Sequence, residues 1–570
     1  MRSRGARAAK VHPRARVVAG VLKAAFVNPE LRRVGFGYAL FGTAELAIWI
    51  AFLVYAYDHG GTKASTAIVL IQLLPCVLLG PLLGAYADQH RPLRVLTGGY
   101  ALQVVAMDAV ATVMVLHAPA AVVFALAPFT ALAFTVTRPA QAALFPAVVR
   151  TPEELTAANV MCGWTTGAAS LLGPLLAGVG LALHGPAFVV IVTTVLSALA
   201  LVLVSKVKVA PEPATPAARA GVLADVRTGL RANLAALGDN AALRMLLSLH
   251  AFYYLLVGAV DLLCVVLAAS YLHLGTGGAG YLNASFGAGA LLAGFVTAFL
   301  VGRRRLKRTL VLALLASVAA LALITVKEDV ALALLLLAAT GLAGTVFDVS
   351  GRTLLQRSSP VDAVAGLFSV LEALMDLGLA LGAVFVQVAI TLGGLRAALV
   401  APAVAGAVLV LALWTRLGRL DNAAVIPHME IRLLRAIPIF AVLPAPTLEA
   451  VARELEPVSV VRGTAVVHEG DPGDPYYAVS TGRLDITRRG VVVNTVSRGE
   501  GFGEIALIRD VPRNATVTAT SDSSLYALRK DLFVGAVTGH AATARVTGQI
   551  ITQRLGDPPA GRDGPQARPA

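Results

Sequence analysis

Long apolar runs dominate the first three quarters of the chain. Between about residue 34 and about residue 417 the sequence divides into roughly twelve such runs, each close to the roughly 20 residues that a helix needs to cross a bilayer. We therefore expect twelve transmembrane helices in this part. The runs centre near Ala44, Leu74, Val105, Thr130, Ser170, Thr194, Val257, Gly289, Ala316, Thr340, Leu379 and Ala405.

Polar turns separate these runs, and alternate turns differ in charge. One set, including 58–61, 184–186, 275–278 and 392–394, is poor in arginine and lysine, whereas the turns between them are basic. Cytoplasmic loops of membrane proteins carry an excess of basic residues. We therefore expect a multi-pass protein of the inner (plasma) membrane with both termini in the cytoplasm. The basic turns hold Arg91, Arg94, Arg150, Arg303, Lys307, Arg308 and Arg357.

The longest internal loop divides the apolar runs into two sets of six. It begins with three prolines, and a polar stretch after them predicts an amphipathic helix. Six plus six spans around a central loop are typical of transporters built from two repeats. We expect a basic cytoplasmic tail over 1–33, six-helix repeats over 34–205 and 244–418, and a cytoplasmic central loop over 206–243.

A different pattern begins after the last apolar run. A predicted linker over 419–429 leads into an amphipathic helix at 429–435, and residues 457–527 then alternate as strands do. These patterns predict a second domain that combines helices and strands. Residues 557–570 are rich in proline, glycine and charge, and we expect them to be disordered.

Composition supports the membrane assignment. The chain is 57% hydrophobic and only 14% charged. Its net charge of +14 lies mostly in short segments between apolar runs, so we expect a lipid bilayer as partner and no nucleic acid. The three cysteines lie in apolar runs and indicate no disulfide framework. Neither a metal-ligand spacing nor a nucleophile with a base is recognisable, and we expect no metal, no cofactor and no enzyme.

Candidate chemistry is concentrated near the C-terminal end. A glycine turn at 501–503 precedes the carboxylate of Glu504 and a short helix start, and Arg513 follows about nine residues later. Glycines let the backbone approach a ligand, N–H groups at a helix start favour an anion, and arginine can pair with phosphate through two N–H groups. Because a carboxylate accepts from hydroxyls, this stretch predicts a binding site for a small ligand with a sugar hydroxyl and a phosphate.

Residues 502–517, F-G-E-I-A-L-I-x-x-x-P-R-x-A-T-V, resemble the phosphate-binding cassette of the cyclic-nucleotide-binding domain family, and 468–482 resemble the turn into its β-roll. The resemblance covers 430–556 and implies a domain of the α+β class, a β-roll (jelly roll) with flanking helices, including hinge and lid helices from Lys530 to about Leu555. It also implies that Glu504 binds the ribose 2′-hydroxyl and Arg513 the cyclic phosphate. The implied nucleotide-binding residues are Gly501, Phe502, Gly503, Glu504, Ile505, Ala506, Arg513, Asn514, Ala515 and Thr516.

The base preference depends on one departure from this pattern. Asn514 stands where the family usually carries Ala, Ser or Thr, and Thr there favours cGMP. The alternative to binding is a domain that keeps the roll but has lost its ligand. Because both key side chains are present, we expect a regulatory cyclic nucleotide to bind. The resemblance favours cAMP, which is the commoner ligand of this family in bacteria, with cGMP as the alternative.

Two parts of the apolar region resemble the major facilitator superfamily. Residues 80–94, G-P-L-L-G-A-Y-A-D-Q-H-R-P-L-R, resemble its loop motif of small residues, an aspartate and arginines. Gly80 and Gly84 recur at a spacing that lets a neighbouring helix approach closely. Asp88 can then accept from an adjacent helix end or arginine, which would latch the cytoplasmic side shut.

The second part covers residues 137–159 and 172–178, the latter L-G-P-L-L-A-G, and resembles the fourth and fifth spans of exporter-type members. Proline removes a backbone hydrogen bond from the fifth span, while the glycines allow tight packing. We therefore expect this helix to bend and to seal against its partner. The resemblance favours export over uptake.

Ionisable residues inside spans mark a transport pathway or a buried ion pair. Glu45 and Asp261 lie in the first and seventh spans, which open the two repeats and line the central cavity in this superfamily, and we expect Glu45 to couple transport to protons. A silent salt bridge is the alternative for either acid. Asp376 follows Glu372 by one helical turn. The transport candidates are Glu45, Asp108, Asp261 and Asp376, and the cytoplasmic-gate candidates are Gly84, Asp88, Arg91, Arg138, Asp348 and Arg352.

Together these patterns predict a secondary active transporter, an exporter of a hydrophobic, cationic or lipid-like small molecule, that a cytoplasmic cyclic nucleotide regulates. Two alternatives stay open. One is a non-transporting membrane-anchored receptor or scaffold, and the other is a lipid flippase of the same fold. The expected partners are the nucleotide, the bilayer, an unidentified small-molecule substrate and protons.

Overall fold

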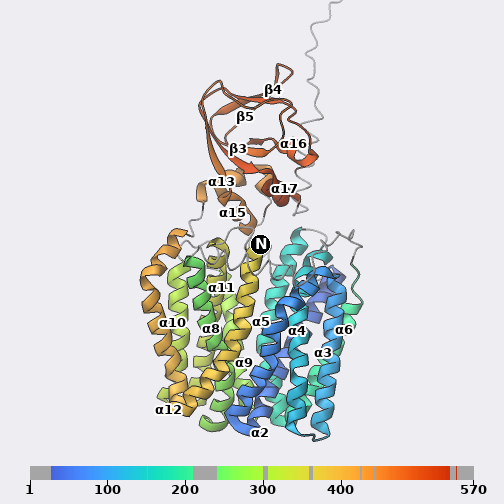
Figure 1. Ribbon diagram of the computed structural model, residues 1–570, viewed down its shortest axis with the longest axis vertical. Coiled ribbons are helices and arrows are strands. Elements are labelled where there is room, and N and C mark those ends of the chain that lie inside the picture. The colour runs from blue at the N-terminus through green and yellow to red at the C-terminus, as the bar shows by residue number, and fades with distance from the viewer. Residues whose placement is uncertain are drawn as a thin grey trace, which may run out of the picture. The chain divides into compact units, whose positions relative to one another are not determined.

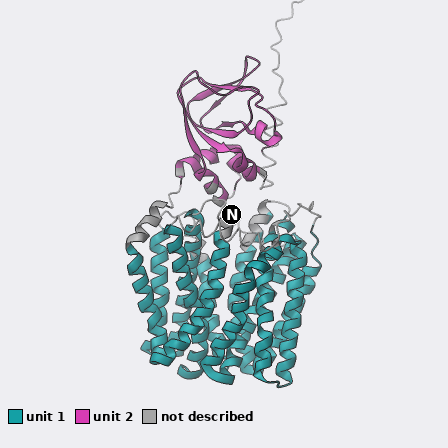
Figure 2. Cartoon of the chain, in the orientation of Figure 1, with its two compact units in different colours: residues 1–424 teal, residues 425–570 magenta. Residues whose placement is uncertain are grey.

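The chain separates into two compact units, residues 1–424 and residues 425–570 (Figure 2). Residues 1–26 of the predicted N-terminal tail, the central-loop helix, most of the predicted lid and the C-terminal tail lie outside the described residues. Residues 29–33, predicted to belong to the tail, form the start of a helix instead. The computed structural model describes residues 27–149, 152–209, 241–298, 306–358, 364–423, 427–441, 443, 445–538 and 547.

The first unit is a bundle of long helices that run side by side (Figure 1). Among its described helices, nine are long and apolar enough to cross a membrane. These are all the α-helices of this unit listed in the next sentence, with the exception of α9. The helices are α2 Pro29–Gln89, α3 Pro92–Val115, α4 Ala120–Val148, α5 Pro152–His184, α6 Pro186–Ser205, α8 Ala241–Val266, α9 Gly278–Ala298, α10 Leu306–Leu323, α11 Val330–Ser358 and α12 Val364–Ala423, with the short π-helix η1 Leu267–Tyr271 and the 3-10 helix η2 Ile324–Val326.

Helices α2 and α12 are long because each covers two of the predicted spans. Their backbone leaves helical geometry at Gly60 and Gly61 in α2 and at Gly394 in α12. Gly61 and Gly394 have φ of 63° and 72°, a region that glycine adopts readily. Both breaks fall in turns predicted from the sequence. All twelve predicted centres lie in helices, whereas the number of spans stays a prediction.

Helix α5 of the first half packs tightly against α9 of the second half. A Cβ atom on Gly280 would lie 2.2 Å from the backbone nitrogen of Gly178, and one on Gly287 would lie 1.9 Å from the carbonyl oxygen of Ser170. Only glycine permits such an approach, so the tight packing expected for residues 172–178 is confirmed. The approach expected at Gly84 is not present, because a Cβ there would meet no described atom within 4 Å.

The second unit contains two four-stranded antiparallel sheets, with strand orders β1-β8-β3-β6 and β2-β7-β4-β5 (Figure 1). The strands predicted between 457 and 527 and the helix at 429–435 are confirmed, and α12 continues into the predicted linker. The elements are α13 His428–Ala436, α14 Pro438–Ala441, α15 Ala445–Arg453, β1 Glu456–Val460, β2 Ala465–Val467, β3 Pro475–Thr481, β4 Arg483–Arg488, β5 Val491–Ser497, β6 Gly501–Phe502, α16 Glu504–Arg509, β7 Thr516–Ala519, β8 Ser523–Arg529 and α17 Lys530–Thr538.

Alternation along the strands gives this unit two apolar cores. One core includes Val479 and Leu525 and lies between the sheets. The other joins the outer face of the first sheet to the helices, and its Tyr476 ring lies 5.4 Å from the Phe440 ring and 4.7 Å from the Phe533 ring, centre to centre. Because helices before, within and after the strands share the second core, a movement of one of them changes the packing of the others.

Candidate functional site

The cassette predicted from the sequence begins where β6 ends. Phe502 of β6 pairs with Tyr477 of β3, and the next residue, Gly503, has a φ of 103°, which favours glycine. A Cβ atom on Gly503 would lie 2.5 Å from Nη1 of Arg513. The chain then enters α16, whose first residue is Glu504. Glycine at position 503 therefore lets Arg513 approach the backbone beside Glu504.

Arg513 is held inside the domain with unused hydrogen-bonding capacity. Its Nη1 donates to the Gly503 carbonyl at 3.2 Å and its Nη2 to the Pro475 carbonyl at 2.6 Å, while Nε is buried with no partner among the described residues. Burial lowers the pKa of the Arg513 guanidinium, and the nearby Tyr477 and Glu504 oppose that shift. Arginine still stays protonated at neutral pH. The site therefore holds a buried cation that an anion would stabilise.

Glu504 and Tyr477 are neighbours of this guanidinium. Glu504 is 1% exposed and is one of the charged neighbours of Arg513. The Tyr477 ring stacks on the Phe502 ring, with centres 5.1 Å apart and planes 20° from parallel. Burial raises the pKa of the Tyr477 phenol, and the Arg513 charge reduces that shift. The structure thus brings the predicted Glu504 and Arg513 together and adds Tyr477.

The end of the cassette is tied to the second sheet. The Asn514 carbonyl accepts from Nε of Arg488 at 3.2 Å, and the Thr516 hydroxyl accepts from the backbone N–H of Glu469 at 2.9 Å. Arg488 was not among the predicted site residues, because its local sequence carries no motif. The register between β4 and β7 brings it there, since Thr487 pairs with Thr516. The half-buried Asn514 and Ala515 follow Arg513 as predicted.

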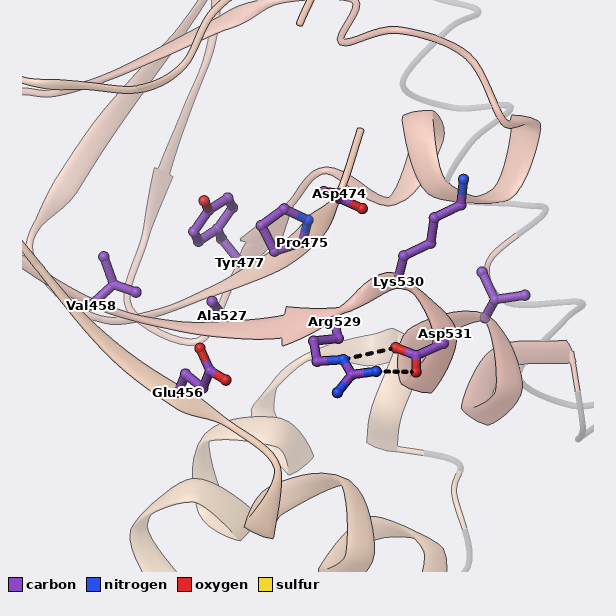
Figure 3. Close-up of a pocket in the computed structure, with 10 residues that line it drawn as sticks. Glu456, Val458, Asp474, Pro475, Tyr477, Ala527, Arg529, Lys530 and Asp531 are labelled. Carbon is purple, nitrogen blue, oxygen red and sulfur yellow. Dashed lines mark hydrogen bonds and ion pairs between the residues drawn. The ribbon is translucent and has the colours of Figure 1, made fainter. Parts of the chain in front are cut away.

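A pocket of about 850 Å³ lies beside the cassette (Figure 3). Strands β1, β3 and β8 and helix α17 line it, and no described residue of 501–516 does. Pro475 and Tyr477 border both the pocket and Arg513. Figure 3 shows Arg529 paired with Asp531 at the pocket, with Nη2 and Oδ2 2.6 Å apart. The pocket and the cassette are therefore neighbours that share one wall.

The membrane unit has a cavity of about 370 Å³ between its two halves. Three of the four transport candidates, Glu45, Asp261 and Asp376, line it. Asp108 lies apart from them at an exposed position of α3 and is not among the lining residues. Three of the predicted gate residues also line the cavity, namely Arg138, Asp348 and Arg352.

A chain of ion pairs links the two halves at this cavity. Nη1 of Arg138, on α4, lies 2.9 Å from Oε2 of Glu372, on α12. The other oxygen of Glu372 lies 3.1 Å from Nη1 of Arg352, on α11, and Nε of Arg352 lies 3.0 Å from Oδ2 of Asp348. The Tyr254 hydroxyl donates to Asp348 at 3.0 Å. Glu372, which the sequence pairs with Asp376 instead, thus connects the predicted gate residues.

The remaining candidates lie in three different settings. Asp261 accepts from Nε1 of Trp49 at 3.0 Å, which also links the two halves. Glu45 and Asp376 make no hydrogen bond or ion pair with the described residues, and Arg138 and Asp376 are the charged neighbours of Glu45. Away from the cavity, Gly84 and Asp88 lie near the end of α2, and Arg91 precedes α3; the Asp88 side chain is outside the description.

Comparison with known families decides the identity of both units. A family model described as Major Facilitator Superfamily matches residues 34–268 and 246–448. The chain belongs to the Major Facilitator Superfamily. A second model, described as Cyclic nucleotide-binding domain, matches residues 457–539 of this superfamily member, so its C-terminal unit contains such a domain. Both resemblances seen in the sequence are confirmed.

Curated relatives of this superfamily member match it over the nucleotide-binding region. The cAMP-dependent protein kinase regulatory subunit of Yarrowia lipolytica is 40% identical over 102 residues, which are 18% of this chain and 27% of the relative. The one from Eremothecium gossypii is 35% identical over 127 residues, 22% of this chain and 26% of the relative. The chain thus spans about a quarter of the length of these relatives. A structure of the regulatory domain of Toxoplasma gondii PKA with cAMP is 34% identical and covers 21% of this chain and 47% of that chain, with a TM-score of 0.20.

Proposed function

We propose that this protein is a secondary active transporter of the inner (plasma) membrane whose activity a cytoplasmic cyclic nucleotide regulates. The observation that carries the proposal is the buried, incompletely bonded Arg513 beside Glu504, in a chain whose other unit encloses a cavity lined by carboxylates. We take cAMP as the ligand, with cGMP as the alternative. Relatives at 40% and 35% identity are named as cAMP-dependent, which supports this choice.

In the proposed binding mode, the phosphate of the nucleotide lies against Arg513 and the ribose against Glu504. A charged phosphate accepts strong hydrogen bonds from a guanidinium, and the buried Nε–H of Arg513 has no protein partner among the described residues. Removing a cation from water is costly unless an anion compensates it. A bound phosphate supplies that anion, while the carboxylate of Glu504 accepts from the 2′-hydroxyl.

The second apolar core offers a route from the ligand to the membrane unit. Leu507 of the cassette helix α16, Phe533 of α17 and Leu434 of α13 are buried in this one core. Helix α13 begins at His428, shortly after α12 ends at Ala423. We propose that the ligand shifts α16 and α17, that α13 follows, and that the transporter equilibrium changes. The ligand can change this equilibrium only to the extent that it binds one conformational state of the transporter more tightly than the other.

For the transporter itself, we propose export of a hydrophobic, cationic or lipid-like small molecule with protons as the coupling ion. Glu45 is the proposed proton-coupling carboxylate, with Asp376 and Asp261 beside the same path, because ionisable groups inside membrane spans mark such pathways. The ion pairs from Arg138 through Glu372 to Arg352 are the proposed tie between the halves, which has to open during transport.

Regulated transport is tested in proteoliposomes with and without nucleotide. We expect saturating cAMP to change the transport rate of the wild-type protein, read as substrate flux or as proton movement reported by a trapped pH-sensitive dye. Glu504→Ala and Arg513→Ala should lose this response and keep the nucleotide-free rate. If both variants respond to saturating cAMP as the wild type does, the proposed regulation is wrong.

A further inference from the structure

The charged groups that line the membrane cavity do not balance. Among the described lining residues, the cations are Arg138 and Arg352. Glu372 bridges both, at 2.9 and 3.1 Å, and Asp348 pairs with Arg352 at 3.0 Å. Two carboxylates therefore compensate two guanidinium groups. This cluster has no net charge, and neither arginine is left to attract an anion.

Three further carboxylates line the same cavity without a cation bound to them in the described part of the chain. Asp261 accepts from Trp49 at 3.0 Å, but an indole is neutral and compensates no charge. Glu45 and Asp376 have no hydrogen bond or ion pair there. They are electrostatic neighbours of each other, and Arg138, which is ion-paired with Glu372, is a charged neighbour of both. Carboxylates inside a membrane protein are costly without a partner. The cavity is therefore suited to a cation.

Five aromatic side chains form part of the remaining wall. A cation is attracted to an aromatic face, most strongly to that of tryptophan. The volume of about 370 Å³ is at the lower end of the roughly 300–1,000 Å³ that is usual for small-molecule pockets, so it fits a compact molecule better than a two-chain lipid. The aromatic lining residues are Trp49, Phe134, Tyr253, Tyr254 and Phe286.

We propose that this cavity binds compact organic cations with an apolar body, with the cationic group between Glu45 and Asp376 and the body against the aromatic wall. The proposal rests on the proposed transporter function and names its substrate class. An organic anion would meet three carboxylates and no free arginine. A neutral molecule would bring no charge to Glu45 and Asp376, which protons alone would then have to neutralise.

A pair of probe ions separates charge from hydrophobicity. Tetraphenylphosphonium and tetraphenylborate have nearly the same size and apolar surface but opposite charge. We would measure equilibrium binding of each to the full-length protein in lipid nanodiscs and subtract binding to empty nanodiscs. We expect saturable binding of the phosphonium cation and none of the borate anion. Equal binding of the two ions, or no saturable binding of the cation, overturns the proposal.

Isosteric variants then locate the cation. Glu45→Gln and Asp376→Asn should each weaken phosphonium binding by at least about tenfold, which corresponds to roughly 1.4 kcal/mol. Asp58→Asn is the matched control, because Asp58 is exposed beside the break in α2 and does not line the cavity. It should leave binding unchanged. Unchanged binding in both cavity variants overturns the proposed site. The comparison of the two ions uses the wild-type protein, so it does not depend on whether a variant folds.

Failure of this substrate class is distinguishable from failure of the proposed regulated transport. Binding of cAMP is measured on the same nanodiscs. If cAMP binds and the phosphonium cation does not, the substrate class is wrong and the regulated transporter stands. The regulated transporter fails on a different result, namely wild-type transport of any identified substrate that saturating cAMP leaves unchanged.

Discussion

Replacing Arg513 by alanine should remove most of the affinity for cyclic nucleotide. The side chain is 5% exposed, and its Nε–H is available for a ligand. Losing one charge-assisted contact to a phosphate costs roughly 1.5–3 kcal/mol, which weakens binding about ten- to a hundredfold. The same change removes the hydrogen bonds to the Gly503 and Pro475 carbonyls. The free energy of unfolding of this domain should therefore fall as well, by roughly 1–3 kcal/mol.

Two further variants separate charge from geometry. Arg513→Lys keeps the positive charge, but an ammonium lacks the planar fork that reaches two carbonyls and still presents an N–H to the ligand. We expect an affinity between those of the wild type and the alanine variant. Arg462→Ala is the matched control, because Arg462 is an exposed arginine of the same domain outside the cassette. It should bind as the wild type does.

The assay is isothermal titration calorimetry of the full-length protein with cAMP and with cGMP, accompanied by thermal unfolding of each variant. Loss of binding in Arg513→Ala counts only at a temperature where the variant is folded. Should the wild type bind saturably and Arg513→Ala bind within about twofold of it, the assignment of the phosphate contact is refuted.

Three other changes test the packing. Gly503→Ala should weaken cAMP binding about tenfold, as measured by calorimetry. The φ of 103° at Gly503 disfavours a side chain, and a Cβ atom there would lie 2.5 Å from Nη1 of Arg513. Equal affinity of the variant and the wild type would contradict this. Gly280→Ala should lower the thermal midpoint of unfolding in detergent, because the added methyl group overpacks α9 against α5. Gly98→Ala should raise the midpoint slightly, because a Cβ atom there meets open space. A shift of the midpoint in the same direction for both variants would refute the close packing. A double-mutant cycle of Arg138→Ala and Glu372→Gln, measured as free energies of unfolding, should give a coupling of roughly 0.2–1 kcal/mol, since both side chains are about two-fifths exposed; zero coupling would show that this pair does not tie the halves together.

Local patterns predicted the helices and the nucleotide cassette because their determinants are close in sequence. The cassette combines a glycine with positive φ, a helix start and an arginine within 16 residues, and each has a defined stereochemical role. The breaks at Gly61 and Gly394 also follow from glycine-rich turns between apolar runs. A short motif with several fixed positions constrains its own geometry, so little information from the rest of the chain is needed.

Contacts between distant segments could not be predicted in this way. Arg138 and Glu372 are 234 residues apart, and their ion pair exists only because α4 and α12 face the same cavity. Asp108 lies in an apolar run like the other acids, but periodicity alone does not tell which side of a helix faces the cavity, and the structure exposes it. Arg488 reaches Asn514 through sheet register, which no local motif encodes.

The central claim, that nucleotide binding changes the transporter, can be tested without knowing the substrate. Cys76 lines the membrane cavity and is 2% exposed, so its labelling by a soluble maleimide reports opening of that cavity. The measurement is the labelling rate of Cys76 in the Cys162→Ser, Cys264→Ala background, with and without saturating cAMP. Coupling of the usual 1–3 kcal/mol predicts a change of about fivefold or more, absent in Arg513→Ala. Equal rates with and without bound cAMP would contradict the account.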